Sequence, residues 1–353
     1  ATELVEAPPY LLDVRTIEEY GAGYIEGTEH IWGNELVNNL DALPADKDTK
    51  IVVYCAKGIR GAYATVMLRL LGYTNVRNLS GGSNAWIAAG LPLAGVPYDL
   101  AGAFDTYLEG LPGTFGALRP DDLAALLDSD AEVLLVDVRT ADEYSEGFIE
   151  GAINVPLNEV MSSLSMLPNL DEQIVIYCGS GHRSALVMVG LNLLGYSNVS
   201  SMLTGVNGWT NREYTLTQEP VEYMGGTAPA FDPQALAVVS EFMNNIPTGY
   251  YVVRPADLNV ELVENAPFLV DVRGEGEYAN GYIEGAINIP LVELVDRAAE
   301  LPQEKDAAIV VYDNPTHRSS MAMTYLRMAG YTNVRVRGGG TGAWTNANLP
   351  LVQ

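Results

Sequence analysis

The chain has 353 residues, 48% of them apolar, so it is long enough to bury several hydrophobic cores of ordinary domain size. Its 45 acidic residues outnumber the 19 basic ones and give a net charge of −26, which argues against nucleic acid and anionic membrane surfaces as partners. No apolar run approaches the roughly 20 residues that cross a bilayer, so the sequence predicts no membrane span.

A pattern that recurs three times opens the chain. An apolar run ending in Asp13-Val14-Arg15 predicts a strand, and Thr16 to Glu19 form a capping box that predicts a helix start. A second apolar run, Ile51 to Tyr54, ends at Cys55 and leads through a short loop into a helix closed by Gly72. The later repeats have a helix ahead of their first strand. This repeat has only ATELVEAPPY there, so we expect the native chain to begin upstream of residue 1.

The second repeat is the most complete. Arg119 to Leu127 predict a helix with Pro120 near its start, and Thr140 to Glu143 form a capping box. Ile174 to Tyr177 run into Cys178, and the loop that ends at Arg183 opens a helix closed by Gly195. The other expected elements are strands at Val133 to Asp137, Ile153 to Val155 and Val199 to Met202, a helix at Leu157 to Leu164 and a last helix that carries Trp209.

The third repeat has the same landmarks with one substitution at its centre. Its first helix begins near Arg254-Pro255, its first strand ends in Asp271-Val272-Arg273, and Gly274 takes the capping position. The central run, Ile309 to Gly330, has Asp313 where the other repeats have cysteine.

Short, continuously apolar strands that alternate with helices predict parallel sheets covered by helices on both faces. The expected fold class is therefore α/β, with three tandem domains over residues 1–97, 103–218 and 232–353. A short amphipathic helix ending at Pro112 or Pro247 precedes each later domain, and we interpret it as a docking element of the domain that follows. Linkers are expected at Gly95 to Leu100 and at Gln218 to Pro229.

Four separated motifs recur in the same order: DVR followed by EY and G(Y/F)IEG, the strand-loop-helix segment, GY(T/S)NV, and Gly-x-x-x-Trp. Together they resemble rhodanese domains over nearly the whole chain. The resemblance implies a sulfurtransferase, in which a cysteine thiolate takes the outer sulfur of a donor such as thiosulfate. The sulfur is held as a persulfide and passed to a thiol or cyanide acceptor. No metal and no cofactor are implied.

The two cysteines, Cys55 and Cys178, are the candidate catalytic residues. A cysteine that ends a strand and opens a glycine-containing loop and a helix lies where backbone N–H groups and the positive helix end converge, which favours the thiolate. Arg60 or Arg183 ends each loop and supplies a positive charge for an anionic donor. The other candidate donor-binding residues are Lys57 and Gly58 in the first repeat and Gly179, Ser180, Gly181 and His182 in the second.

Less specific interpretations of these residues stay open. Each cysteine could be a buried, inert thiol, and each loop arginine could pair with an acidic neighbour. His182 could be a packing histidine, since Ile59 takes its place in the first repeat and His317 in the third, and Lys57 could be a solvated lysine.

Two recurring features are interpreted as structural. The first is the Asp-x-Arg pair at the end of each first strand, because it recurs in the repeat that lacks cysteine: Asp13 with Arg15, Asp137 with Arg139, and Asp271 with Arg273. The second is a tryptophan of the hydrophobic core: Trp86, Trp209 and Trp344.

Loop length separates sulfur chemistry from phosphate chemistry. Both cysteine loops read C-x4-R, whereas the related cell-cycle phosphatases and the tyrosine phosphatases use C-x5-R, which leaves room for a tetrahedral phosphate. The sequence therefore favours sulfur transfer over phosphatase or arsenate reductase activity. The loop opening CGSG resembles mercaptopyruvate sulfurtransferases, but His182-Arg183 follow it, which favours thiosulfate or polysulfide as the donor.

The third repeat is interpreted as a structural or partner-binding unit, because Asp313 cannot form a persulfide and would repel an anionic donor from Arg318. An ion pair between these two residues, and a homo-oligomer or protein partner bound through this repeat, stay open. The alternative to an enzyme is a secreted, non-catalytic scaffold or assembly subunit. The few lysines and the abundant Asn, Gly, Thr and Tyr resemble exported bacterial multi-domain rhodaneses, so a secreted or cell-envelope location is favoured over a cytoplasmic one.

Overall fold

The computed structural model describes residues 8–353 except 92, 96 and 130. The chain forms two compact units, of which one ends at Tyr98 and the other begins at Asp99. The stretch ATELVEA, on which the expected lack of a leading helix depends, lies outside the described residues. None of the helices in the described part of the chain combines the length and the apolar character that a bilayer crossing requires.

The first unit holds one parallel sheet with the strand order β2-β1-β3-β4. Its strands are β1 (Tyr10–Asp13), β2 (Thr28–His30), β3 (Ile51–Tyr54) and β4 (Val76–Asn78). Its helices are α2 (Ile17–Gly21), α3 (Ile59–Leu70) and α4 (Gly82–Ala88), with the 3-10 helices η1 (Leu36–Asn38) and η2 (Leu40–Ala42). Neighbouring residues of β3 face opposite sides of the sheet, so Val53 packs with Leu68 of α3 whereas Tyr54 packs with Trp86 of α4.

The second unit holds two five-stranded parallel sheets, with the orders β5-β9-β8-β6-β7 and β10-β14-β13-β11-β12. The strands of the second repeat are β5 (Ala117–Leu118), β6 (Leu134–Asp137), β7 (Ile153–Asn154), β8 (Ile174–Tyr177) and β9 (Val199–Met202). Those of the third are β10 (Val252–Val253), β11 (Phe268–Asp271), β12 (Ile287–Asn288), β13 (Ile309–Tyr312) and β14 (Val334–Arg337). Every residue of β8 and β13 is buried, as their continuous apolar sequences predict.

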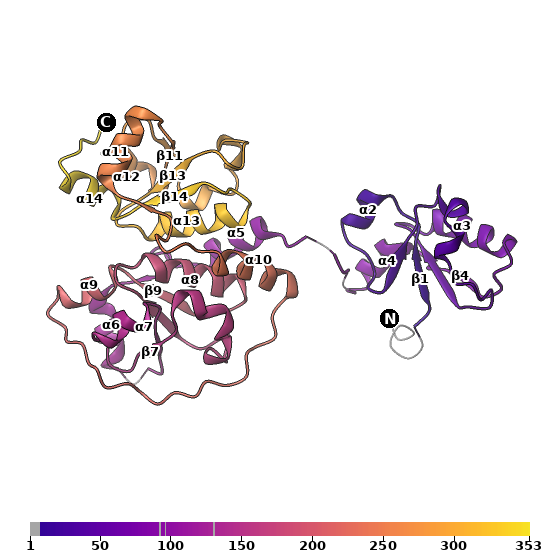
Figure 1. The fold of residues 1–353 in the computed structure, drawn as a ribbon, viewed down its shortest axis with the longest axis horizontal. Helices are drawn as coiled ribbons and strands as arrows, with labels where there is room; N and C mark the ends of the chain where they lie inside the picture. The colour runs from indigo at the N-terminus through magenta and orange to yellow at the C-terminus, as the bar shows by residue number, and fades with distance from the viewer. Residues whose placement is uncertain (1–7, 92, 96, 130) are drawn as a thin grey trace. The chain divides into compact units, whose positions relative to one another are not determined.

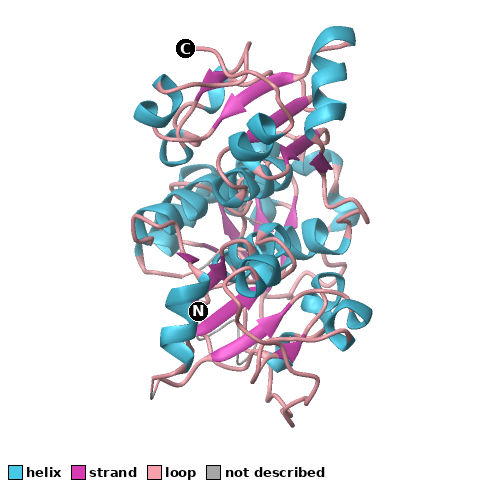
Figure 2. Ribbon diagram, turned by 90° about the vertical axis from the view of Figure 1, so that its left-hand side faces the viewer, coloured by secondary structure: helices cyan, strands magenta, loops and turns pink. Residues whose placement is uncertain are grey.

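Helices lie on both sides of these sheets (Figure 1, Figure 2). In the second repeat they are α5 (Leu100–Gly110), α6 (Pro120–Leu127), α7 (Ala141–Ser145), η3 (Leu157–Ser162), η4 (Leu164–Met166), α8 (His182–Leu193) and α9 (Gly205–Thr210). In the third they are α10 (Pro233–Asn244), α11 (Pro255–Glu264), α12 (Glu275–Ala279), η5 (Leu291–Glu293), η6 (Ala298–Glu300), α13 (His317–Met328) and α14 (Gly340–Asn346). The expected fold class, three tandem α/β domains with parallel sheets, is confirmed.

The connector helices α5 and α10 each dock on the domain that follows them, as predicted, and also on a second domain that the sequence did not indicate. α10, which precedes the third repeat, packs on η3 and α8 of the second repeat as well as on α13. α5, which precedes the second repeat, contacts α13 and η5 of the third as well as α8. An amphipathic pattern shows that one face of a helix is buried, but it does not show against which neighbour. The two connectors therefore join the second and third repeats into one unit.

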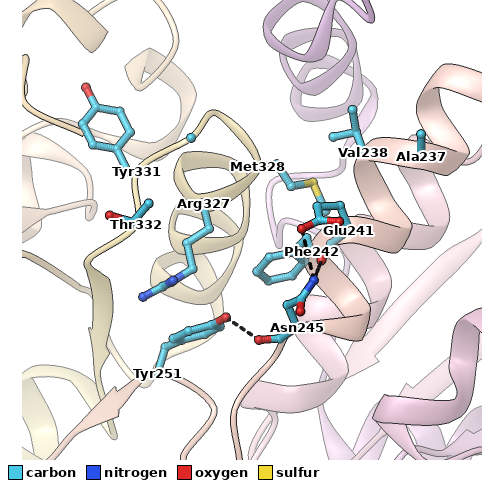
Figure 3. A pocket seen from close by; sticks show the side chains of 11 residues that line it. Ala237, Val238, Glu241, Phe242, Asn245, Tyr251, Arg327, Met328, Tyr331 and Thr332 are labelled. Atoms are coloured by element: carbon cyan, nitrogen blue, oxygen red, sulfur yellow. Dashed lines mark hydrogen bonds between the residues drawn. The ribbon is translucent and has the colours of Figure 1, made fainter. Parts of the chain in front are cut away.

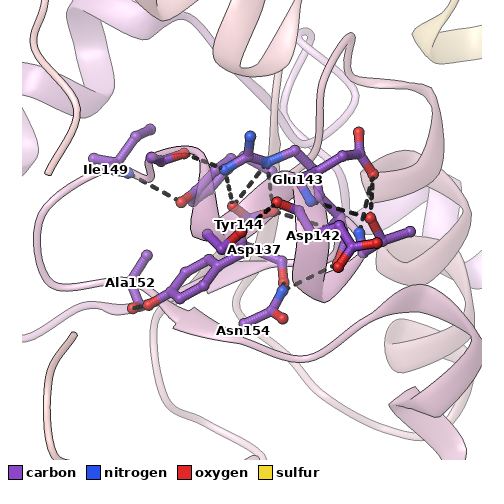
Figure 4. A network of polar contacts seen from close by, with 12 residues as sticks. Asp137, Asp142, Glu143, Tyr144, Ile149, Ala152 and Asn154 are labelled. Atoms are coloured by element: carbon purple, nitrogen blue, oxygen red, sulfur yellow. Dashed lines mark hydrogen bonds and ion pairs between the residues drawn. The ribbon is translucent and has the colours of Figure 1, made fainter. Parts of the chain in front are cut away.

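An Asp–Arg clamp fastens the end of the first strand in every repeat. In the second repeat, Arg139 Nη2 lies 2.6 Å from Asp137 Oδ2 and also donates to the carbonyl of Gly147 at 2.7 Å. Figure 4 shows Asp137 within this network of polar contacts. The same bonds join Arg15 to Asp13 and Gly23, and Arg273 to Asp271 and Gly281. Both partners of each clamp are buried, so their role is structural, as predicted.

Candidate active site

Each cysteine follows the central strand of its sheet and begins a tight loop into the next helix. Gly181 precedes α8 with φ of 90°, and Gly58 precedes α3 with φ of 87°, a left-handed conformation that favours glycine. The backbone N–H groups of these glycines donate to Cys178 Sγ and Cys55 Sγ, both at 3.1 Å. Both sulfurs therefore face an N–H group of their own loop at a helix N-terminus.

The last helix of the repeat, α9 in the second and α4 in the first, bonds to the start of each cysteine loop. The carbonyl of Cys178 accepts from the N–H of Val206, and that of Gly179 from the N–H of Asn207, at 2.8 and 3.0 Å. Equivalent bonds join Cys55 to Ser83 and Ala56 to Asn84. The backbone of the first two residues of each cysteine loop is therefore fixed, which helps to preorganise the loop.

The two sulfurs are equally buried, but different side chains surround them. Cys55 is 1% exposed and Cys178 is 0% exposed. The hydroxyl of Ser184 lies 3.7 Å from Cys178 Sγ and accepts from Ser201 at 2.8 Å. In the first repeat Gly61 and Asn78 stand at the two serine positions, and a Cβ on Gly61 would lie 2.3 Å from Asn78 Oδ1. Two different pairs thus fill the same space, and neither was identified from the sequence.

The loop arginines are paired with glutamates from the capping boxes. Arg183 Nη1 and Nη2 donate to Glu143 at 2.7 and 2.6 Å, and Arg60 donates to Glu19 over the same distances. The hydrogen bond from the arginine lowers the pKa of Glu143 and of Glu19 to about 2. Each loop arginine therefore pairs with an acidic residue, which was one of the alternatives left open by the sequence. The same glutamates cap the N–H of Thr140 and Thr16.

His182 lies at the boundary between the second and third repeats. Its Nε2–H donates to the carbonyl of Tyr250 at 2.8 Å, and its Nδ1 lies 2.7 Å from Ser320 Oγ. Burial lowers the pKa of His182 to about 4. His317 makes the corresponding bond to the carbonyl of Phe115 at 2.8 Å. His182 thus makes the contacts expected of a packing histidine. Its role in donor binding stays a prediction.

Tyr250 and Phe115 show how each connector covers the loop of the other repeat. The guanidinium carbon of Arg183 lies 5.1 Å from the centre of the Tyr250 ring, and that of Arg318 lies 6.0 Å from the centre of the Phe115 ring. Neither aromatic residue was predicted from the sequence as part of a site. Both occupy the same place in the two connectors, three residues after Pro112 and Pro247, and that recurrence was the available signal.

A cavity of about 640 Å³ opens beside the Cys178 loop, between the second and third repeats. Ser180, His182, Arg183 and Glu143 line one part of it, and Tyr250 lines another. It brings together most of the residues predicted for donor binding in the second repeat. In the first repeat, Lys57 of the Cys55 loop is exposed to solvent and Gly58 is buried.

The third repeat keeps the loop but fills the sulfur position with a carboxylate. Asp313 is 1% exposed and accepts from the backbone N–H of Arg318 at 3.0 Å and from the Ser319 hydroxyl at 2.6 Å. Arg318 Nε lies 3.6 Å from Asp313, so the anticipated ion pair exists. The shorter bonds of Arg318, at 2.6 and 2.9 Å, go to Glu277.

Another cavity of about 610 Å³, between α10 and α13, lies away from the cysteine loops (Figure 3). Tyr251 donates to the carbonyl of Asn245 at 3.0 Å, and Arg327 lies 3.4 Å from the centre of the Tyr251 ring. Its lining includes no residue of either cysteine loop, whereas Ser180, His182 and Arg183 of the Cys178 loop line the other cavity. The cavity beside Cys178 is therefore the better candidate for a reaction site.

The comparisons with known proteins agree with this architecture. A family model described as the rhodanese-like domain matches residues 1–89, 119–212 and 255–347. The chain therefore belongs to the rhodanese-like domain family, with three tandem copies.

Several curated relatives share this family. A sulfurtransferase from Allochromatium vinosum is 35% identical over 89 residues, which are 25% of this chain and 82% of the relative. The thiosulfate sulfurtransferase of Azotobacter vinelandii is 28% identical over 268 residues, covering 65% of this chain and 93% of the relative. The match to the Bacillus subtilis protein YrkF, 33% identical over 86 residues, spans 24% of this chain and 46% of that protein.

Among solved structures, a thiosulfate sulfurtransferase from Pseudomonas aeruginosa aligns over 98% of this chain and 86% of its own. The identity is 20% and the TM-score is 0.29, a score too low to compare the arrangement of the repeats.

Proposed function

We propose that this chain is a sulfurtransferase that moves a sulfane sulfur from thiosulfate or polysulfide to a thiol or cyanide through persulfides on Cys55 and Cys178. The observation that carries the proposal is the Cys178 sulfur at the mouth of α8, bonded to the N–H of Gly181, in a loop that ends in Arg183. The family membership supports the same chemistry, since several relatives are named thiosulfate sulfurtransferases.

The reaction has two displacement steps. In the first, the cysteine thiolate attacks the outer sulfur of thiosulfate, the S–S bond of the donor breaks, and sulfite leaves with the bonding electron pair. In the second, a thiolate or cyanide attacks the terminal sulfur of the persulfide and restores the cysteine thiolate. No net oxidant is needed, and the N–H groups of the loop stabilise the negative charge on the sulfur in both steps.

The Arg183–Glu143 pair gives this site a specific feature. A dianionic donor that reaches Arg183 meets the carboxylate of Glu143, which already accepts from both terminal nitrogens of the guanidinium. We propose that the donor competes with Glu143 for Arg183. Glu143 would keep the arginine oriented between turnovers, because it is itself fixed by the N–H of Thr140 at 3.0 Å.

The third repeat is proposed to act without forming a persulfide. Asp313 has no sulfur, and its carboxylate already accepts the N–H of Arg318 that would face an anion. Its contribution is to the neighbouring site, where Tyr250 and Ser320 hold His182 beside the Cys178 loop.

Intact-mass measurement after incubation with thiosulfate tests the proposal. Two sulfur adducts on the unmodified chain, one on Cys55→Ser or Cys178→Ser, and none on the double variant would support it. Sulfite release in the same samples should follow the adduct count. A chain that acquires no adduct and releases no sulfite would overturn the proposal.

A non-catalytic scaffold is the second candidate, and the near-complete burial of both sulfurs favours it. The same mass measurement separates the two, because a scaffold with inaccessible thiols acquires no adduct. A secreted or cell-envelope location is a further proposal that rests on composition. Fractionation of the native host with an antibody to this chain tests it, and recovery in the cytoplasm alone would contradict it.

A further inference from the structure

An apolar stripe runs along α3 of the first unit. Ile59, Tyr63, Val66 and Leu70 are 64, 72, 58 and 84% exposed. Their spacing of four, three and four residues places them on one face of the helix. Single exposed apolar residues are common on protein surfaces, but a row of four large ones on one helix is typical of an interaction site.

The equivalent face is buried in the two other repeats, because there the corresponding helices pack on each other. The residues of α8 that correspond to the stripe are His182, Leu186, Val189 and Leu193, and those of α13 are His317, Met321, Thr324 and Met328. Leu186, Val189, Met321 and Thr324 are each 0% exposed. The structure thus contains one example of how this face of the repeat is covered, and the cover is the same face of another repeat together with the connector helices α5 and α10.

The pairing of α8 with α13 is reciprocal. His182 at the start of α8 contacts Tyr250 from the connector of the third repeat, and His317 at the start of α13 contacts Phe115 from the connector of the second. Each helix therefore presents the same face to the other, as in an isologous contact between identical subunits. An identical helix with the same stripe could pair in this way.

The polar contact between α8 and α13 is absent from the sequence of α3. His182 and Ser320, which lie 2.7 Å apart, correspond to Ile59 and Ala62 in the first repeat. In a pair of two α3 helices, Ile59 would meet Ala62 of the other copy, so an apolar contact replaces a buried hydrogen bond. Because both side chains are apolar, this contact between two α3 helices leaves no side-chain polar group unsatisfied.

Charge is compatible with self-association at α3. The helix contains no carboxylate, although the chain has 45 acidic residues and a net charge of −26. Its charged residues are Arg60, which is paired with Glu19, and Arg69, which donates to the carbonyl of Val76. Depletion of acidic charge together with exposed aliphatic and aromatic side chains is the composition expected at the core of an interface.

We infer that the chain forms a homodimer in which the α3 face of one copy packs on the α3 face of a second copy. The equivalent faces of α8 and α13 already cover each other, so within this chain they are occupied. A second copy supplies the missing counterpart. Since Ile59 directly follows Gly58, the second copy would lie beside the Cys55 loop, as the third repeat lies beside the Cys178 loop.

Sedimentation velocity of the full chain over a range of micromolar concentrations tests the dimer. We expect the unmodified chain to associate, and Tyr63→Glu and Leu70→Glu each to weaken association by about 100-fold, because a buried pair of like charges opposes it. Val263→Glu is the matched control, since Val263 of α11 is 85% exposed and lies outside the stripe. All three positions are exposed, so circular dichroism should show folded variants.

The position of the contact is tested by a photo-crosslinking amino acid at position 66. Isotope-labelled and unlabelled chains are mixed, and a cross-linked peptide that joins α3 of a labelled chain to α3 of an unlabelled one supports the inference. Three results would overturn it: an unmodified chain that stays monomeric, a dimer as sensitive to Val263→Glu as to Tyr63→Glu, or cross-links from α3 only to residues 99–353.

Discussion

The side chains of His182 and Ser320 meet across the boundary between the second and third repeats, with Nδ1 and Oγ 2.7 Å apart. The other ring nitrogen, Nε2, donates to the carbonyl of Tyr250. Nε2 carries a proton, because a carbonyl oxygen only accepts. Burial of the ring disfavours a second proton and its charge, so the junction beside the Cys178 loop favours the neutral histidine.

This junction predicts that acid weakens the second unit. Burial lowers the pKa of His182 to about 4, against about 6.5 for an unfolded histidine. Between these values the unfolded chain binds a proton that the folded chain does not bind, so the free energy of unfolding falls as the pH falls from 6.5 to 4. The loss is on the order of 3 kcal/mol for this residue.

Urea unfolding at pH 7.5 and pH 5 measures the effect. The full chain should lose more stability between these pH values than His182→Asn does, although the variant is less stable at both. Burial lowers the pKa of His317 as well, so some pH dependence will remain in the variant. An equal loss in the two proteins would contradict the prediction.

Replacement of Asp137 by asparagine should destabilise the second unit by about 3–5 kcal/mol. The substitution leaves the buried guanidinium of Arg139 without its ionic partner, which costs more than the loss of a surface pair. Thermal unfolding monitored by calorimetry gives the change. Asp121→Asn is the control, because Asp121 pairs with Arg212 on the surface and its loss should cost less than about 1 kcal/mol. Similar effects of the two substitutions would rule out the buried clamp as a main source of stability.

Arg183→Met should slow sulfur uptake at Cys178. If Arg183 stabilises the charge of the donor as the bond to sulfite breaks, kcat/KM for sulfite release from thiosulfate should fall by about 100-fold. A Cys55→Ser background restricts the measurement to the second repeat. Arg212→Met, which removes an exposed arginine of the same repeat, should leave the rate unchanged. An unaltered rate in Arg183→Met would remove this residue from the proposed mechanism.

Asp313→Ala should lower stability without lowering sulfur transfer. The substitution leaves the N–H of Arg318 and the hydroxyl of Ser319 without their buried acceptor, a loss of about 2 kcal/mol in the free energy of unfolding. The number of sulfur adducts should remain two. Asp306→Ala, at an exposed turn position, provides the comparison. A folded Asp313→Ala protein that no longer releases sulfite would assign the third loop a catalytic role.

Much of the fold could be predicted from local sequence. The order of strands and helices, the capping box at Thr140 and the Asp137–Arg139 clamp all depend on residues close together in the chain. The boundary errors are small, and the helix expected over Leu157 to Leu164 is a pair of 3-10 helices, η3 and η4. Apolar spacing over so short a segment does not separate the two helix types.

The missing parts of the candidate site depend on residues far apart in sequence. Glu143 was identified as a capping residue, and its bonds to Arg183, 40 positions later, could not be read from that local motif. Tyr250 reaches His182 across 68 positions and comes from a connector that the sequence assigned to the third repeat alone. Alignment of the two connectors would have singled out their shared aromatic position, but not its contact.

The Asp–Arg clamp has an evolutionary consequence. Its hydrogen bonds join residues that are two and eight positions apart in the chain. A gene duplication that copies this short segment therefore copies every residue of the clamp. A repeat with aspartate at the loop position, as at Asp313, therefore still has the same clamp. The clamp residues that stabilise the fold are therefore different from the residue at the cysteine position of the loop, and the two can change independently within one repeat.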